Sequence, residues 1–173
     1  MLTTSSFPEP GHDHHRCASD AIARAEQICR SRGQRFTPIR RNVLEALLSS
    51  HRPLGAYEII DALAVSVARP APITVYRALD FLMDNGLVHR IESRNAFLAC
   101  AHGHDAASTV AFLICEHCGS VGEVSAAPVA QKLHEAARQT GFVSRLSVVE
   151  ITGTCAHCHA KGVKGAESAA QPA

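Results

Sequence analysis

The N-terminal part of the chain shows the apolar spacing of amphipathic helices. Ser19 is a suitable N-cap, and the spacing after it predicts a first helix over residues 19–33. Thr37 followed by Pro38 predicts a second helix, because threonine caps helices and proline suits the first helical position. The apolar side chains of these two helices are Ile22, Ala25, Ile28, Ile39, Val43, Leu44, Leu47 and Leu48.

Two more helices are predicted before the pattern changes. The third covers residues 56–67, and the prolines of Arg69-Pro-Ala-Pro72 prevent it from continuing. The fourth covers residues 73–85 and ends at Gly86, which suits the left-handed conformation after a helix. Its inward stripe consists of Val75, Leu79, Leu82 and Met83.

A β-hairpin is predicted after the fourth helix. Two short apolar runs, 87–92 and 96–100, flank the turn Ser93-Arg-Asn95. Helices followed by a hairpin predict a winged-helix DNA-binding domain over residues 19–92. The same pattern also fits a helical domain whose outer arginines only contact water.

The C-terminal part has a different pattern. Residues 109–125 predict two strands around a Cys-x-x-Cys motif, and residues 129–140 predict an amphipathic helix that stops at Gly141. A third strand is predicted over residues 143–152. Its more apolar positions are Leu146, Val148 and Ile151.

These elements predict an α+β protein of two units. A dimerisation unit over residues 100–162, with a three-stranded antiparallel sheet, would follow the winged helix after a hinge at 93–99. Its core is small, so burial of a sheet edge in a homodimer and a structural metal would stabilise it. The composition of residues 1–18 and 163–173 predicts disordered tails.

Composition narrows the possible partners and compartments. With a formal charge of +1 over 173 residues, DNA binding must come from a local patch, such as the five arginines between Cys29 and Asn42. The longest apolar run, 110–115, is strand length and predicts no membrane span. Seven cysteines without an export signal predict a cytoplasmic protein.

Two Cys-x-x-Cys motifs supply four thiols, Cys115, Cys118, Cys155 and Cys158. Four thiolates suit a tetrahedral structural zinc with bonds of about 2.3 Å. The main alternative is thiol redox chemistry, but neither motif opens a helix after a strand as in thioredoxin-like folds.

A second set of potential ligands is His89, Cys100, His102, His104 and Glu123. Each has an ordinary explanation by itself, such as a buried thiol or a polar loop residue. Together they flank the junction between the two units, where a mixed nitrogen, sulfur and oxygen site would connect them and respond to metal.

The chain resembles the ferric uptake regulator superfamily of metal-dependent transcription factors. The resemblance runs from about Ala21 to Cys158 and rests on both Cys-x-x-Cys motifs and two further segments, Arg35-Phe-Thr-Pro-Ile-Arg40 and Thr74-Val-Tyr-Arg-Ala-Leu79. The zinc uptake regulator branch is the most similar, through Ala56-Tyr-Glu-Ile-Ile-Asp61, Val88-His89 and Cys100. Iron-sensing members generally carry a His-His-Asp-His run where this chain has Val110-Ala-Phe-Leu-Ile114.

The resemblance implies two zinc ions per subunit. The structural site falls on the four cysteines, and the regulatory site falls on His89, Cys100, Glu123 and a loop histidine. The family histidine nearer the first motif falls near Ser108, which cannot replace it. We therefore expect His104, whose reach is helped by the Gly103 turn, with His102 as the alternative.

The resemblance also implies how DNA is bound. Arg77 and Thr74, with Tyr76 beside them, are expected in the major groove, Tyr57 near the backbone or bases, and Arg35 on phosphate. The expected function is a zinc-responsive repressor of metal-uptake genes that binds an inverted-repeat operator as a zinc-loaded homodimer.

Three other functions compete with this expectation. One is an iron- or peroxide-sensing regulator of the same superfamily, and another is a zinc-trafficking or thiol-redox module. A zinc hydrolase is not expected, because the chain has no His-Glu-x-x-His motif. We expect no enzyme activity, no membrane partner and no small-molecule substrate other than the metal ion.

Overall fold

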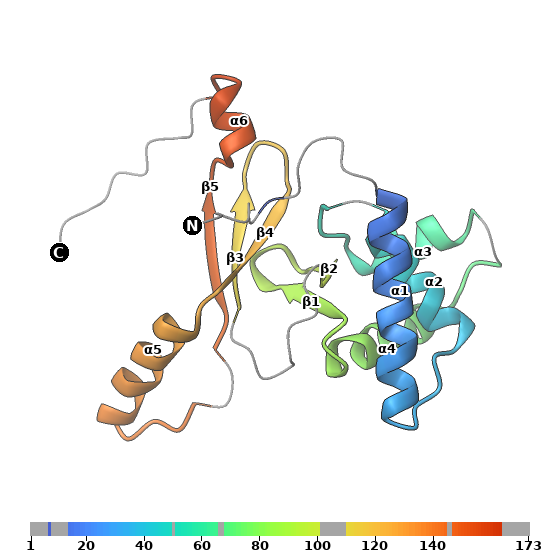
Figure 1. Cartoon of the computed structure of the whole chain (residues 1–173), viewed down its shortest axis with the longest axis horizontal. Coiled ribbons are helices and arrows are strands. Elements are labelled where there is room, and N and C mark those ends of the chain that lie inside the picture. Colours follow the sequence, from blue (N-terminus) through green and yellow to red (C-terminus); the bar gives the residue numbers. More distant parts are fainter. Residues whose placement is uncertain are drawn as a thin grey trace.

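The chain folds into two adjoining units (Figure 1). The structure, a computed structural model, describes residues 7, 14–49, 51–65, 68–100, 110–144 and 147–163. The N-terminal unit contains four helices and a two-stranded hairpin, and the C-terminal unit contains a three-stranded sheet and two helices. Among the described residues, no helix has both the length and the apolar character needed to cross a membrane.

The four N-terminal helices are α1 (His14–Ser31), α2 (Pro38–Leu48), α3 (Ala56–Leu63) and α4 (Pro72–Asp84). Thr37 is the N-cap of α2 and Pro38 is its first residue, as predicted. Ser19 is not an N-cap, because α1 starts at His14 and Ser19 lies inside the helix. The predicted tail over 1–18 therefore overlaps α1. Gly86 follows α4 with a φ of +67°, a left-handed conformation that glycine adopts without steric cost.

A wing follows α4. Its strands β1 (Val88–Ile91) and β2 (Ala96–Ala99) pair antiparallel. A single 3-10 turn (Glu92–Arg94) and the left-handed Asn95 connect them. Residues 93–99, expected to form the hinge, thus contain a paired strand of the wing.

One core holds the wing and the helices together. Val43 and Leu47 of α2, Ile59 of α3 and Leu79 of α4 are at most 1% exposed. The wing contributes Val88 and Phe97 to the same cluster. Burial of each such side chain stabilises the fold by about 1.5–3 kcal/mol, so α4 and the wing are expected to move as one body.

The C-terminal unit contains β3 (Val110–Cys115), β4 (Val121–Ser125), α5 (Ala127–Gln139), β5 (Val149–Gly153) and α6 (Ala156–Ala160). The strand order is β4-β3-β5, with β4 antiparallel and β5 parallel to β3. The prediction of a fully antiparallel sheet was wrong. After α5 reverses the chain, β5 pairs with the free edge of β3 instead of β4, and there it runs in the direction of β3.

The wing and the sheet share a second, smaller apolar cluster. Ile91 and Leu98 from the wing pack with Phe112, Ile114 and Val121 from the sheet. The N–H of Val121 also donates a hydrogen bond to the carbonyl of His51 in the N-terminal unit, at 3.3 Å. The two units therefore meet through buried apolar side chains as well as polar contacts.

Candidate metal centres and nucleic-acid interface

The four cysteines of the two Cys-x-x-Cys motifs converge at one end of the sheet. Their sulfur atoms lie within 4.8 Å of one another, and Cys118 Sγ is 3.8 Å from Cys155 Sγ. The parallel pairing explains this convergence. Cys115 at the end of β3 is in register with Gly153 at the end of β5. Both motifs therefore begin where these two parallel strands end, on the same side of the sheet.

The surroundings of Cys115 favour its thiolate. Burial alone raises the pKa of this thiol, but backbone N–H groups of Cys118, Cys155 and His117 lower the pKa to about 6. The N–H of Cys155 donates to Cys115 Sγ at 3.4 Å. By contrast, burial and the other three cysteines raise the pKa of Cys158 to about 12. Four sulfurs at this separation repel one another as anions, and a bound divalent cation removes that repulsion; the donor set fits zinc.

His117 lies beside this thiol cluster. Its Nε2 is 3.2 Å from Thr154 Oγ1, so the side chain connects the first motif to the residue before Cys155.

A second cluster lies where the wing meets the sheet. His89 comes from β1, Cys100 directly follows β2, and Glu123 comes from β4. Their ligand atoms lie within 4.8 Å of one another. Cys100 is 1% exposed and Glu123 is 7% exposed. One hairpin and a strand of the C-terminal sheet therefore place nitrogen, sulfur and oxygen donors together in a buried position.

The protonation state of His89 suits metal binding. Burial lowers the pKa of His89, although the nearby Glu123 carboxylate partly opposes this effect. A neutral imidazole offers a free nitrogen lone pair. His89 Nε2 is buried and makes no hydrogen bond to any part of the chain that the structure describes. A buried polar atom without a hydrogen bond is costly, and a zinc ion held by His89, Cys100 and Glu123 would satisfy it.

The predicted fourth ligand of this cluster falls outside the residues that the structure describes. His104 and the alternative His102 both lie in residues 101–109, outside the described part of the chain, as does Ser108. Both histidines remain predictions for this position.

Two neighbours of the second cluster were missed by sequence reasoning. The ring of Phe112 packs against the ring of His89, with centroids 5.1 Å apart and planes inclined by 57°. Arg24 of α1 donates through Nη2 to the carbonyl of Cys100 at 2.8 Å. No local motif marks either contact, because each joins residues that only the tertiary fold brings together.

The predicted DNA-contacting residues lie on the surface of the N-terminal unit. Thr74, Tyr76 and Arg77 occupy the outer face of α4, opposite its buried stripe. Tyr76 is 40% exposed, and Tyr57 on α3 is 64% exposed. Arg35 is exposed just before α2. All five are therefore accessible to a large ligand, and sequence reasoning identified them through the family resemblance.

Three side chains of the arginine-rich stretch make contacts within the N-terminal unit. Arg32 donates to Asn85 Oδ1 at 2.9 Å, and Arg41 pairs with Glu26. The guanidinium of Arg40 lies over the ring of Phe81, 3.3 Å from its centroid. Three of the five arginines therefore hold α1, α2 and α4 together.

A winged helix joined to a sheet through a buried nitrogen, sulfur and oxygen cluster defines a class of metal-binding, DNA-binding proteins. The chain belongs to the ferric uptake regulator family, whose family model matches residues 31–152. It is 39% identical to the zinc uptake regulation protein of Escherichia coli (strain K12) over 139 residues, which are 80% of this chain and 81% of that protein.

Two solved structures are also similar. A zinc uptake regulator complexed with zinc and DNA has a TM-score of 0.80 and 37% identity, covering 85% of this chain and 98% of that chain. The crystal structure of holo XcZur has a TM-score of 0.75 and 44% identity, covering 83% of this chain and 99% of that chain.

Proposed function

We propose that this protein is a zinc-responsive, DNA-binding transcriptional repressor of metal-uptake genes, acting in the cytoplasm without enzymatic activity. The observation that carries the proposal is the position of the His89, Cys100 and Glu123 cluster. It lies at the contact between the wing and the sheet, so occupancy of this site affects how the two units are held. Similarity to a zinc uptake regulator complexed with zinc and DNA supports both the metal and the partner.

Each subunit would hold two zinc ions, one in each cluster. Cys115, Cys118, Cys155 and Cys158 would form the structural site, and His89, Cys100, Glu123 and His104 or His102 the regulatory site. A zinc ion at the regulatory site would supply a bond between the wing and the sheet. His89 would transmit that restraint to α4, because β1 follows α4 directly and shares its core.

DNA recognition is assigned to the exposed face of the winged helix. Arg77, Thr74 and Tyr76 on α4 would contact base edges in the major groove. Tyr57 and Arg35 would contact the backbone and fix the orientation of the domain. Two such units in a homodimer would match an inverted-repeat operator, because the two-fold symmetry of the protein is repeated in the DNA.

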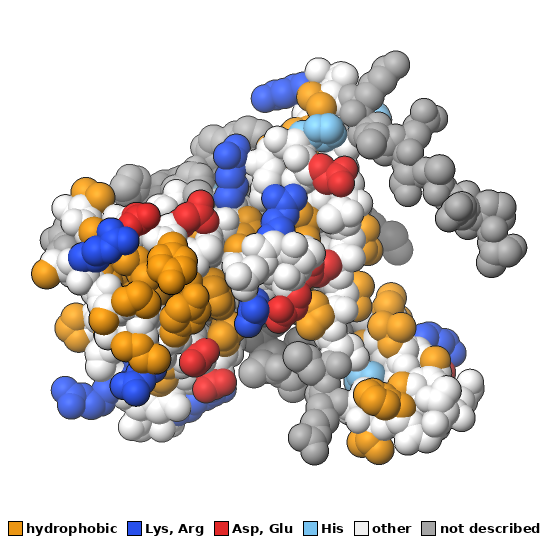
Figure 2. All heavy atoms as spheres, turned by 180° about the vertical axis from the view of Figure 1, so that it is seen from behind, with side chains coloured by type: hydrophobic (Ala, Val, Ile, Leu, Met, Phe, Trp, Pro, Cys, Tyr) orange, Lys and Arg blue, Asp and Glu red, His pale blue; other side chains and the backbone are white. Residues whose placement is uncertain are grey.

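The dimer is assigned to the C-terminal unit, predicted over residues 100–162, and DNA binding to the four helices with the wing, which extends to Ala99. Several apolar side chains of the C-terminal unit are 44–83% exposed. Figure 2 has hydrophobic side chains on the surface over α5. Exposed apolar side chains favour burial against a second copy. Those of the C-terminal unit include Val129, Leu133, Phe142, Val143, Val148 and Ile151.

Operator binding by the metal-free dimer tests the proposal. Zinc should restore binding, while iron(II) and manganese(II) should restore little, because a cysteine in the site favours the softer metal. Restoration by iron(II) but not by zinc would instead support an iron or peroxide sensor. Rapid zinc exchange from the four thiolates together with disulfide-reductase activity would support the trafficking or redox alternative.

A further inference from the structure

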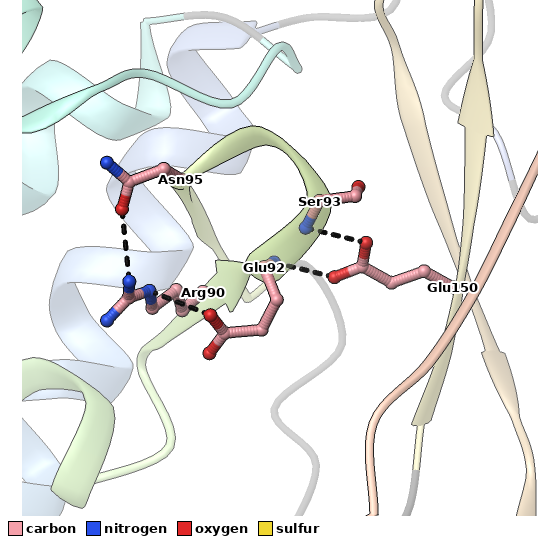
Figure 3. Close-up of polar contacts among 5 residues, drawn as sticks. All are labelled: Arg90, Glu92, Ser93, Asn95 and Glu150. Carbon is pink, nitrogen blue, oxygen red and sulfur yellow. Dashed lines mark hydrogen bonds and ion pairs between the residues drawn. The ribbon is translucent and has the colours of Figure 1, made fainter.

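The tip of the wing is held by an acidic side chain from the C-terminal unit (Figure 3). Glu150 of β5 accepts hydrogen bonds from two consecutive backbone N–H groups. Its Oε1 is 2.6 Å from the nitrogen of Glu92, and its Oε2 is 3.1 Å from the nitrogen of Ser93. Both N–H groups belong to the start of the 3-10 turn, where no intrahelical acceptor is available to them. The carboxylate thus satisfies two donors at once with charge-assisted bonds.

The position of Glu150 in the sheet connects it to the regulatory cluster. Phe112 of β3 is in register with Glu123 on one side and with Glu150 on the other. Paired residues in a sheet project to the same face, so Glu123, Phe112 and Glu150 form one row across the three strands. All three members of this row contact or approach the hairpin: Glu123 lies beside His89, Phe112 packs on the His89 ring, and Glu150 binds the turn.

Two side-chain contacts link the turn to the strand that precedes it. Arg90 Nε lies 3.2 Å from a carboxylate oxygen of Glu92, and Arg90 Nη2 donates to Asn95 Oδ1 at 3.0 Å. Arg90 of β1 thus contacts the first residue of the turn and the residue that follows it. Because β1 leads from α4 into this turn, fixing the turn also restrains the direction of α4.

We propose that Glu150 is a positioning residue for DNA binding. It holds the tip of the wing to the same row of the sheet that supplies Glu123, so the wing keeps a fixed orientation relative to the sheet when the regulatory site is filled. The regulatory ligands His89 and Cys100 hold the hairpin near its base, at the end away from the turn. The second attachment, at Glu92 and Ser93, holds the tip, so the hairpin is fixed to the sheet at both ends. This inference rests on the proposed zinc-dependent function.

The test compares operator binding by the full-length dimer and its Glu150→Gln variant, each with and without regulatory zinc. Glutamine keeps the size of the side chain but loses the charge, and its NH2 group is a donor, so only one of its two terminal atoms can accept a hydrogen bond from the turn. Affinity of the zinc-loaded form should fall about five- to tenfold, within the usual range of coupling between sites. Affinity of the metal-free form should change less than about twofold, because the attachment works together with the metal bond.

A control variant and the zinc response of the wild-type protein distinguish the possible results. Glu135→Gln removes one acidic charge from α5, where the carboxylate pairs with Lys132, and should leave zinc coupling unchanged. An equal loss in both metal states of Glu150→Gln, or the same loss in Glu135→Gln, would overturn the proposal. If wild-type protein shows no zinc response at all, the proposed function fails, whatever the variant does.

A measurement that does not use DNA tests the attachment itself. Amide hydrogen exchange at Glu92 and Ser93 should be slow in the zinc-loaded wild type and faster in Glu150→Gln, with the Asn95 amide as an internal reference because it donates to the Glu92 carbonyl. Removal of regulatory zinc from the wild type should also accelerate exchange at the first two amides. Unchanged exchange in the variant would overturn the proposal.

Discussion

Cys100 and Cys115 are both buried cysteines, but their neighbours differ. Cys115 lies among three other thiols and three backbone N–H groups that lower its pKa. Cys100 lies with one imidazole and one carboxylate, and its carbonyl accepts a hydrogen bond from Arg24. The first environment is made almost entirely by the C-terminal unit, whereas the second needs both units. The two residues should therefore respond differently to the same substitution.

Replacing each cysteine by serine is expected to separate the two sites. Cys115→Ser should unfold or monomerise the C-terminal unit, because a structural zinc site contributes directly to folding. Cys100→Ser should leave a folded dimer whose operator binding is weak and insensitive to zinc. Circular dichroism, light scattering and metal analysis of both variants check this, and a full zinc response of Cys100→Ser would contradict the assigned regulatory site.

Arg77 provides a test of DNA recognition that leaves the metal sites intact. Arg77→Ala should weaken specific operator binding by about 1–3 kcal/mol without changing zinc content, because the side chain is exposed on α4. Arg138→Ala, which removes an exposed arginine from α5 in the C-terminal unit, serves as the matched control. Fluorescence anisotropy with operator and with scrambled DNA measures the loss. Equal losses from both variants would indicate a general charge effect instead of base recognition.

At the level of elements, strand β5 has two functions that depend on its pairing with β3. Its end brings Cys155 to Cys115, and its start brings Glu150 to the wing. If β5 had instead paired antiparallel with the outer edge of β4, it would still run in the direction of β3. In that case β4 would separate β5 from β3. The choice of sheet edge thus determines whether the thiol cluster and the wing contact can form.

The Glu150 contact should depend on pH in a defined direction. Burial raises the pKa of Glu150, but hydrogen bonds from Ser93 and Glu92 outweigh this effect and lower the pKa overall. A lowered folded-state pKa means that the stabilisation is present above the unfolded value of about 4.3 and disappears as pH falls through the folded value. The amide proton shifts of Glu92 and Ser93 should therefore titrate together below about pH 4.3. A midpoint above that value would contradict the prediction.

At the scale of the whole molecule, the exposed apolar side chains of the C-terminal unit require a partner surface. Leu133 on α5 is 48% exposed, and Val143 in the following loop is 83% exposed. Within the described residues the sheet of this unit has three strands, and its shared cluster with the wing covers one face. Burial of the remaining apolar surface in a homodimer would stabilise a unit that is small for its own core.

Leu133→Asp should disrupt the dimer. A charge at this position has to be desolvated when the second copy binds, which costs more than the apolar contact that it replaces. Gln139→Asp, also on an exposed position of α5, is the matched control and should leave the dimer intact. Sedimentation or multi-angle light scattering at micromolar concentration measures the effect. A dimer of unchanged stability in Leu133→Asp would place the interface elsewhere.

The sequence by itself determined the local features of this protein. The Thr37-Pro38 start of α2, the Gly86 end of α4 and the hairpin around Ser93 follow from backbone chemistry within a few residues. The two Cys-x-x-Cys motifs likewise identify a four-thiol set, because donor type and spacing are local properties. The start of α1 was missed, since no strong cap separates Ser19 from the residues before it.

Only the tertiary structure decided which distant groups meet. The parallel pairing of β5, the approach of Glu150 to the wing and the bond from Arg24 to Cys100 depend on which sheet edge and which helix face become neighbours. Sequence spacing cannot fix these choices, because either edge of β3–β4 would accept a further strand with the same side-chain alternation. For the same reason, sequence proposed His89, Cys100 and Glu123 as a set, but only the packed wing and sheet bring their ligand atoms within 4.8 Å.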